Sequence, residues 1–188
     1  MPTLSYVLIV FLAAAWAVVL FLALRALTRF RGTRVVRCPE TGKAAAVEID
    51  LTRAVLAAAT AKSDLSLKQC SRWPERGDCA QLCVQQIESS PEDCLVRRML
   101  ANWYRGKSCV FCRKPFEDIK WHDHQPAFID ADRNPRQWSE VSAENIPEIL
   151  TTAKPVCWSC QIAESFRRRY AEMLVDRPWK PGEGLRLH

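Results

Sequence analysis

A run of uncharged, mostly apolar residues from Leu4 to Leu24 constrains this chain more than any other feature of its sequence. A helix of this length spans roughly 30 Å, the thickness of the hydrocarbon core of a bilayer. A cleaved signal peptide would need basic residues before the run, a shorter apolar stretch of about 7 to 15 residues and a small-residue cleavage site after it. Residues 1–3 contain no basic side chain, and arginines follow the run. The sequence therefore predicts a single transmembrane helix over residues 4–24.

The next segment, residues 25–37, is rich in arginine and contains no acidic residue. Basic residues beside a membrane span remain cytoplasmic. We therefore expect residues 1–3 to form a short outside tail and the body of the protein to be cytoplasmic, at the plasma (inner) membrane. The arginines of this basic collar would contact anionic lipid headgroups. They are Arg25, Arg29, Arg31, Arg34 and Arg37.

Charge in the rest of the chain is nearly balanced. The whole chain has 27 Lys and Arg against 21 Asp and Glu, and the basic collar accounts for most of the excess. Nucleic-acid binding depends on clustered positive charge, so this balance argues against nucleic acid as a partner. We expect a protein partner instead, which no sequence motif identifies.

Nine cysteines are a high number for a body of this size. Cytoplasmic thiols stay reduced, so cysteines there bind metals or carry out redox chemistry more often than they form disulfides. Four of them form two Cys-x-x-Cys pairs, "CVFC" and "CWSC". Zinc takes four thiolates in a tetrahedron, and two such pairs complete a closed structural site. The predicted ligands are Cys109, Cys112, Cys157 and Cys160.

The surroundings of the two pairs indicate how each would be held. "CVFCRKPF" is typical of a zinc knuckle, in which backbone amides after the first cysteine point at its sulfur, and the second pair opens a predicted helix from Cys157 to Val175. The same thiolates suit an iron–sulfur cluster, although the compact cysteine run of bacterial ferredoxins is missing. One pair acting alone as a thioredoxin-like dithiol would need a strand–helix alternation that the sequence lacks.

A knuckle, then strands, then a Cys-x-x-Cys pair at a helix start is the arrangement of the treble-clef zinc finger, which residues 109–170 resemble. Between the pairs, "WHDHQPA" is similar to part of one treble-clef family, the His-Asn-His nucleases. That family has a further metal-binding histidine where this chain has Gln161, and its asparagine lies nearer to the second pair. The resemblance implies functional roles for Asp123, His124, Asn145, Cys157 and Cys160.

The aromatic residues of this segment have simpler interpretations. His122 and His124 are two residues apart, so on a strand they would share one face, either as a polar pair or, with Asp123, as ligands of a further ion. The tryptophans are expected to fill the core of the module. They are Trp121, Trp138 and Trp158.

Several elements are predicted in the first half of the chain. A hairpin over residues 35–50 has Cys38 at its turn, a short helix over 51–60 follows, and a polar connection comes next. Asp78 would cap a helix over residues 79–89. A further helix would start at Ser90 and bury the stripe Leu95, Val96, Met99, Leu100 and Trp103.

The cysteines of this half predict a second metal site. Cys79 and Cys83 are four apart, so on a helix they would share one face and one metal. Cys70, on the preceding loop, would be the third ligand. The fourth would be Cys38 or Cys94, and we prefer Cys38 because it lies on a turn with free backbone amides.

The predicted architecture is a transmembrane helix followed by a small α+β, cysteine-rich domain. Residues 38–106 would hold the hairpin and helices, residues 107–176 the treble-clef-like module, and residues 177–188 a flexible tail. The expected function is that of a membrane-anchored, zinc-binding adaptor or assembly factor. The alternatives are an iron–sulfur electron-transfer protein at the membrane surface and a divergent His-Asn-His nuclease.

Overall fold

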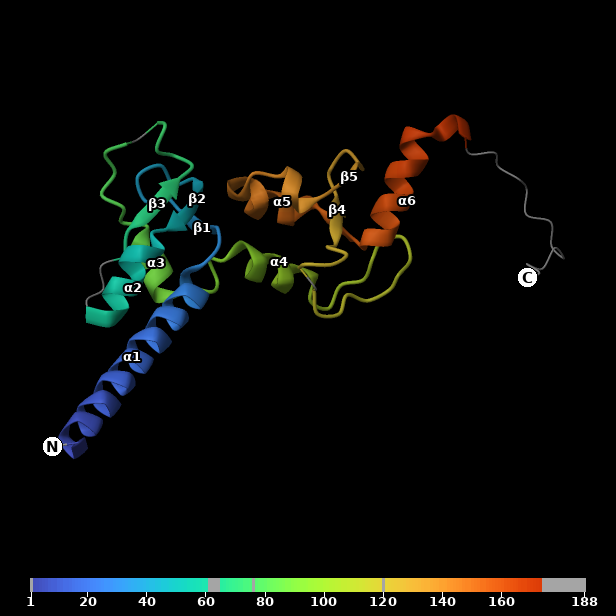
Figure 1. The fold of residues 1–188 in the computed structure, drawn as a ribbon. Coiled ribbons are helices and arrows are strands. Elements are labelled where there is room, and N and C mark those ends of the chain that lie inside the picture. Colours follow the sequence, from blue (N-terminus) through green and yellow to red (C-terminus); the bar gives the residue numbers. More distant parts are fainter. Residues whose placement is uncertain (1, 61–64, 76, 120, 174–188) are drawn as a thin grey trace, which may run out of the picture.

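The computed structural model describes residues 2–60, 65–75, 77–119 and 121–173. A long helix, α1, leads into two small lobes that lie side by side (Figure 1). The N-terminal lobe, residues 34–94, contains the sheet β1-β2-β3, and the C-terminal lobe, residues 96–173, contains the sheet β5-β4-β6. The predicted flexible tail, 177–188, lies outside the described residues.

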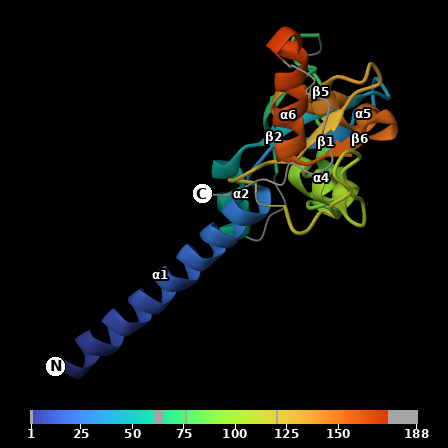
Figure 2. The same cartoon turned by 90° about the vertical axis from the view of Figure 1, so that its right-hand side faces the viewer.

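Helix α1 runs from Pro2 to Phe30. Between Ser5 and Phe30 it is long and apolar enough to cross a membrane, with a mean hydropathy of 3.0 in a stretch of which 0 % is buried. It continues past the predicted end of the apolar run because no helix breaker intervenes before Gly32, whose φ is +105°. Figures 1 and 2 show α1 projecting away from both lobes, and only its last turns lie against α2.

The N-terminal lobe is built on an antiparallel sheet of β1 (Arg34–Arg37), β2 (Ala44–Ile49) and β3 (Leu67–Cys70). The predicted hairpin and the helix after it, α2 (Leu51–Thr60), are confirmed. The third strand lies in the segment predicted as a polar connection. Only the two end residues of β3 are buried, so it lacks the alternation that would indicate a strand in the sequence.

The helix predicted over residues 79–89 is shorter than expected. Helix α3 spans only Val84–Ser89, and residues 79–83 form a loop. Gln81 in that loop has a φ of +54°, and its side-chain oxygen accepts a hydrogen bond from the Leu67 amide at 2.9 Å. This long-range bond replaces a helical turn, so the prediction that Cys79 and Cys83 share a helix face is wrong.

The following helix also begins later than Ser90. Helix α4 spans Val96–Tyr104, and Leu95 before it is extended. The cause is pairing with the outer edge of β1, where the Val35 amide donates to the Cys94 carbonyl at 2.8 Å and Leu95 forms a bridge with Arg34. Strand pairing therefore outweighs the capping signal. Of the predicted apolar stripe, Val96, Met99, Leu100 and Trp103 still face a core, but Leu95 does not belong to it.

The C-terminal lobe has β4 (Ala127–Ile129) at the centre of its sheet, between β5 (Pro135–Arg136) and β6 (Lys154–Val156). Its helix α6, Trp158–Arg169, follows β6 directly. This helix ends before the predicted Val175, which lies outside the described residues. The remaining elements are the 3-10 turns η1 (Trp138–Glu140), η2 (Ala143–Asn145) and η3 (Ala171–Met173) and the helix α5 (Ile146–Thr152).

The core of this lobe joins α4 to the sheet. Tyr104 is buried against Phe128 and Trp138, and its hydroxyl donates to the Ala127 carbonyl at 2.5 Å and accepts from the Trp138 indole at 2.8 Å. Burial raises the pKa of Tyr104, so the hydroxyl keeps its proton. Trp138 and the half-buried Trp121 belong to the core as predicted, but Trp158 is 39 % exposed and does not.

Candidate metal centre

The first Cys-x-x-Cys pair lies on a tight turn before β4. The Cys109 amide donates to the Lys114 carbonyl and the Arg113 amide donates to the Cys109 carbonyl, both at 2.9 Å. Arg113 closes the turn with a φ of +62°. The Phe111 and Cys112 amides point at the Cys109 sulfur, as expected for a zinc knuckle.

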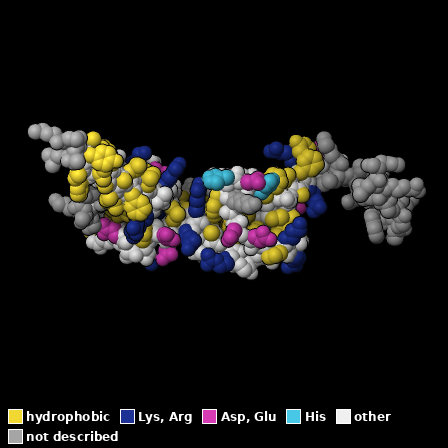
Figure 3. Space-filling model, turned by 60° about the horizontal axis from the view of Figure 1, so that its bottom comes forward, with side chains coloured by type: hydrophobic (Ala, Val, Ile, Leu, Met, Phe, Trp, Pro, Cys, Tyr) yellow, Lys and Arg dark blue, Asp and Glu magenta, His cyan; other side chains and the backbone are white. Residues whose placement is uncertain are grey.

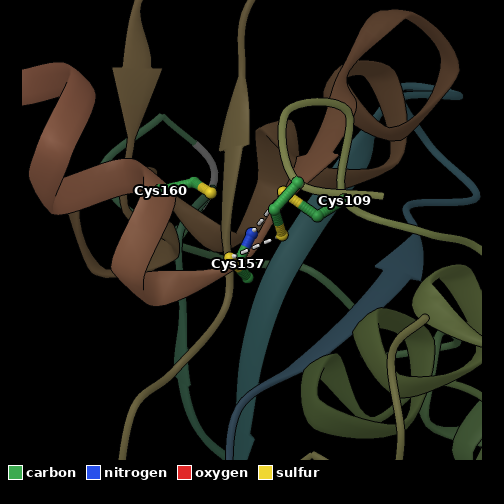
Figure 4. A group of neighbouring side chains, drawn as sticks. Cys109, Cys157 and Cys160 are labelled. Carbon is green, nitrogen blue, oxygen red and sulfur yellow. Dashed lines mark hydrogen bonds between the residues drawn. The ribbon is translucent and has the colours of Figure 1, made fainter. Parts of the chain in front are cut away.

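The second pair lies where β6 ends and α6 begins. Cys157 is the N-cap residue of α6, and Cys160 is in the first turn of the helix. The Cys157 amide donates to Cys109 Sγ at 3.4 Å, which ties the helix start to the knuckle. Figure 4 shows Cys109 and the two cysteines of α6 converging on one place.

The four sulfur atoms are spaced for a single metal ion. Those of Cys109, Cys112, Cys157 and Cys160 all lie within 4.8 Å of one another. Cys112 Sγ and Cys157 Sγ are 3.7 Å apart. Tetrahedral zinc with Zn–S bonds of about 2.3 Å requires neighbouring sulfurs at about 3.8 Å. The donor set therefore fits a four-thiolate ion, and within the described residues no other group of three or more His, Cys, Asp or Glu is this close.

The electrostatics of the four thiols favour a bound cation. Burial opposes ionisation of Cys109, but the amides of Cys157, Cys112 and Phe111 outweigh it and lower the pKa of Cys109 to about 7. Burial, followed by the neighbouring thiols, raises the pKa of Cys160 to about 12. Four thiolates in one place repel each other, and a divalent ion relieves that repulsion.

No family model, curated protein or solved structure matches this chain.

The residues that resemble the His-Asn-His nucleases are only partly brought together. His124 and Asp123 line an open cavity of about 330 Å³ beside Cys157 and Trp158, and His124 packs edge-on against Trp158 at 4.4 Å. Asn145 is in η2, which lies against β1 and β2 in the other lobe, and it lines neither cavity that contains His124.

The predicted strand through the histidines is wrong. Residues 121–124 form a loop, and His124 has a φ of +50°. The side chains of His122 and His124 therefore do not share a strand face. His124 Nδ1 lies 2.5 Å from Asp123 Oδ1. His122 lines one cavity together with Asp123 and His124, and it also lines a second cavity near the end of α1.

Arg34 departs from the expectation that the whole basic collar faces lipid. Four arginines of the collar are exposed, but Arg34 is 0 % exposed. Its guanidinium donates to the carbonyls of Arg29 (2.5 Å), Phe30 (2.6 Å), Gly32 (3.1 Å) and Pro91 (3.3 Å). It therefore caps the last carbonyls of α1 and fastens that helix to the N-terminal lobe.

Two surface features were missed in the sequence. The first is the α6 stripe, defined as Trp158, Ile162 and Phe166, which are 39 %, 46 % and 53 % exposed. Their spacing of four residues was visible, but it indicates a buried face as readily as an exposed one. The second is a cavity of about 620 Å³ at the end of α1, lined by residues that include Arg31, Arg97 and His122.

Proposed function

We propose that this protein is a membrane-anchored, zinc-binding scaffold that presents the α6 stripe to a protein partner. One observation carries the proposal: the four-cysteine site fixes the start of α6, and the helix then exposes three large apolar side chains. Single exposed apolar residues are ordinary on protein surfaces. Three in a row on one helix face are typical of a groove-binding helix.

We assign zinc as the metal at this site. Residues 107–173 would then form a treble-clef-like module. The order of a knuckle, the β4–β5 hairpin, β6 and a helix that starts with two ligands supports it. Such a site is closed and structural, because all four coordination positions are filled by cysteine. Its task would be to hold α6 in place.

Helix α1 serves as the anchor, in the plasma (inner) membrane with the lobes in the cytoplasm. Support comes from the exposed Arg25, Arg29, Arg31 and Arg37, which follow the apolar stretch and would stay on the cytoplasmic side. Anionic lipid headgroups would contact these arginines and enter the cavity lined by Arg31 and Arg97.

Figure 3 shows histidine and basic side chains on one face of the molecule, between the apolar side chains of α1 and those toward the opposite end. His122 and Arg31 line the same cavity. A surface of this kind suits a membrane boundary better than it suits a nucleic-acid groove, because the basic residues are few and lie close to the end of α1.

Elemental analysis of the full chain in detergent tests the metal assignment. We expect a colourless protein that contains zinc, and Cys157→Ser should remove that zinc. A brown protein with iron in place of zinc would instead support the electron-transfer alternative. Alkaline phosphatase fused after His188 should be inactive if the lobes are cytoplasmic.

The partner is tested by placing a photo-crosslinking residue at Ile162 in cells that express the chain. A discrete crosslinked product is expected at this position. The matched control is Leu56 in α2, which is exposed at 60 % but lies outside the α6 stripe. If both positions give the same smear of products, the α6 stripe is not a binding surface.

A further inference from the structure

The turn of the β1–β2 hairpin has the same hydrogen-bond pattern as the zinc knuckle of the C-terminal lobe. The Cys38 amide donates to the Lys43 carbonyl and the Gly42 amide donates to the Cys38 carbonyl, both at 2.8 Å. These bonds join the same relative positions as those of Cys109, Arg113 and Lys114. Gly42 has a φ of +67°, close to the +62° of Arg113. Residues 38–43 therefore form a second knuckle.

This second knuckle also directs its donors at sulfur. The Thr41 hydroxyl, then the Thr41 and Glu40 amides, hydrogen bond to the Cys38 sulfur and lower the pKa of Cys38. Thr41 thus occupies the place that Cys112 has beside Cys109. The hairpin turn is a knuckle with one cysteine, so its remaining ligands must come from other segments.

Two glutamines hold those segments against the knuckle. The Gln86 side chain donates to the Arg37 carbonyl at 2.6 Å and accepts from the Arg37 amide at 3.1 Å, which fixes α3 beside Cys38. Gln81 accepts from the Leu67 amide, which fixes the loop of residues 79–83 against β3. Cys79 and Cys83 flank Gln81, and Cys70 ends β3.

The resulting positions bring Cys38, Cys70 and Cys79 near Cys83. Cys70 and Cys83 are buried at 8 % and 7 % exposure in one core cluster, with Cys38 packed against it. Cys79 lines an open cavity together with Glu40 of the knuckle. Cys70, Cys79 and Cys38 all lie near enough to Cys83 for their charges to act on its sulfur.

The ninth cysteine is engaged elsewhere. Cys94 Sγ lies 3.9 Å from the Gln86 carbonyl as a thiol donor, on the segment that pairs with the outer edge of β1. Cys38 lies in a knuckle and Cys94 lies in a strand pairing, so we retain Cys38 as the fourth ligand.

We propose that Cys38, Cys70, Cys79 and Cys83 form a second four-thiolate metal centre, of the zinc-binding class, that closes the N-terminal lobe. The four sulfurs are more widely spaced than the 4.8 Å of the C-terminal group, so binding draws them together. Cys79 supplies that movement, because it lies on the loop and borders an open cavity. A metal there would stabilise a lobe whose apolar core is small.

The first experiment counts zinc per chain in the full-length protein loaded with zinc in detergent. Two ions are expected. Each of Cys38→Ser, Cys70→Ser, Cys79→Ser and Cys83→Ser should leave one, whereas Cys94→Ser should leave two. Cys157→Ser should also leave one, because it removes only the ion of the C-terminal lobe. A wild-type chain with one zinc that Cys157→Ser removes would overturn this inference and leave the proposed function intact.

A rescue variant guards against loss of metal by misfolding. Because Thr41 lies where Cys112 lies in the other knuckle, Thr41→Cys should supply a replacement ligand. The double variant Cys79→Ser with Thr41→Cys should bind two zinc ions again, and its cobalt-substituted form should regain the absorbance of the wild type. A folded double variant with one zinc would contradict the assignment of Cys79 and of the turn as a ligand-bearing knuckle.

Discussion

Replacing Arg34 with methionine should destabilise the N-terminal lobe strongly, although the sequence presents this residue as one more surface arginine. The guanidinium donates to four backbone carbonyls. Methionine fills a similar volume but leaves those carbonyls without their donor. At about 1 kcal/mol each, the low end because the bonds are only partly buried, the loss is about 4 kcal/mol. Removing a buried charge returns about 1 kcal/mol, so we expect a net cost of about 3 kcal/mol.

Urea unfolding of the zinc-loaded full chain in detergent, followed by tryptophan fluorescence, measures this cost. With a slope of about 2 kcal/mol per molar urea, the midpoint should fall by about 1.5 M. Arg34→Lys should be intermediate, because an ammonium keeps the charge but has fewer donors. Arg31→Met is the matched control, since it removes the same charge from an exposed position and should cost less than about 0.5 kcal/mol. Equal midpoints for Arg34→Met and Arg31→Met would refute a structural role of the buried guanidinium.

Three further perturbations follow from other contacts. Tyr104→Phe should cost about 2 kcal/mol in urea unfolding, because it leaves the Ala127 carbonyl and the Trp138 indole without partners, whereas Tyr170→Phe should cost almost nothing. Gly32→Ala should cost about 2 kcal/mol, because its φ is +105° and the added carbon would meet Leu95 Cδ1 at 3.1 Å. Gly77→Ala, which meets nothing within 4 Å, is the control, and an equal cost would contradict the strain at Gly32. Removing zinc with a chelator should lower the free energy of unfolding of the C-terminal lobe, and added zinc should restore it. The expected loss is about 4 kcal/mol relative to a sample with free zinc at roughly a thousand times its Kd. A circular-dichroism melt unchanged by the chelator would count against a structural metal.

The elements that sequence reasoning predicted correctly are those specified by local signals. The turn "PETGK" between β-branched residues predicted the hairpin, and two Cys-x-x-Cys pairs predicted the four-cysteine cluster. The spacing of the α4 stripe predicted its buried face. The hairpin and the stripe lie within a few residues of their signals. The cluster joins two pairs 45 positions apart, but each pair is itself a local signal for a metal ligand.

The errors come from interactions between residues far apart in the chain. Ser90 has a good capping signal, but pairing of Leu95 with Arg34 delays the helix. Gln81 is not helical, because its side-chain oxygen accepts a hydrogen bond from the distant Leu67 amide. Arg34 is charged and lies among exposed arginines, so nothing near it indicated burial. When backbone and polar groups form hydrogen bonds with residues far away in the chain, the sequence near them carries no periodic pattern that would indicate it.

The capped end of α1 has a mechanical consequence. Arg34 binds the last carbonyls of the helix, and β1 starts at that same residue. The apolar helix is therefore joined to the N-terminal lobe without a flexible linker. The second edge of β1 in turn holds the segment that enters α4. A membrane-embedded α1 would thus move with the N-terminal lobe as one rigid body. Any tilt or rotation of α1 in the bilayer would then move both lobes together. The distance of α6 from the lipid surface and its orientation would therefore depend on the tilt angle of α1.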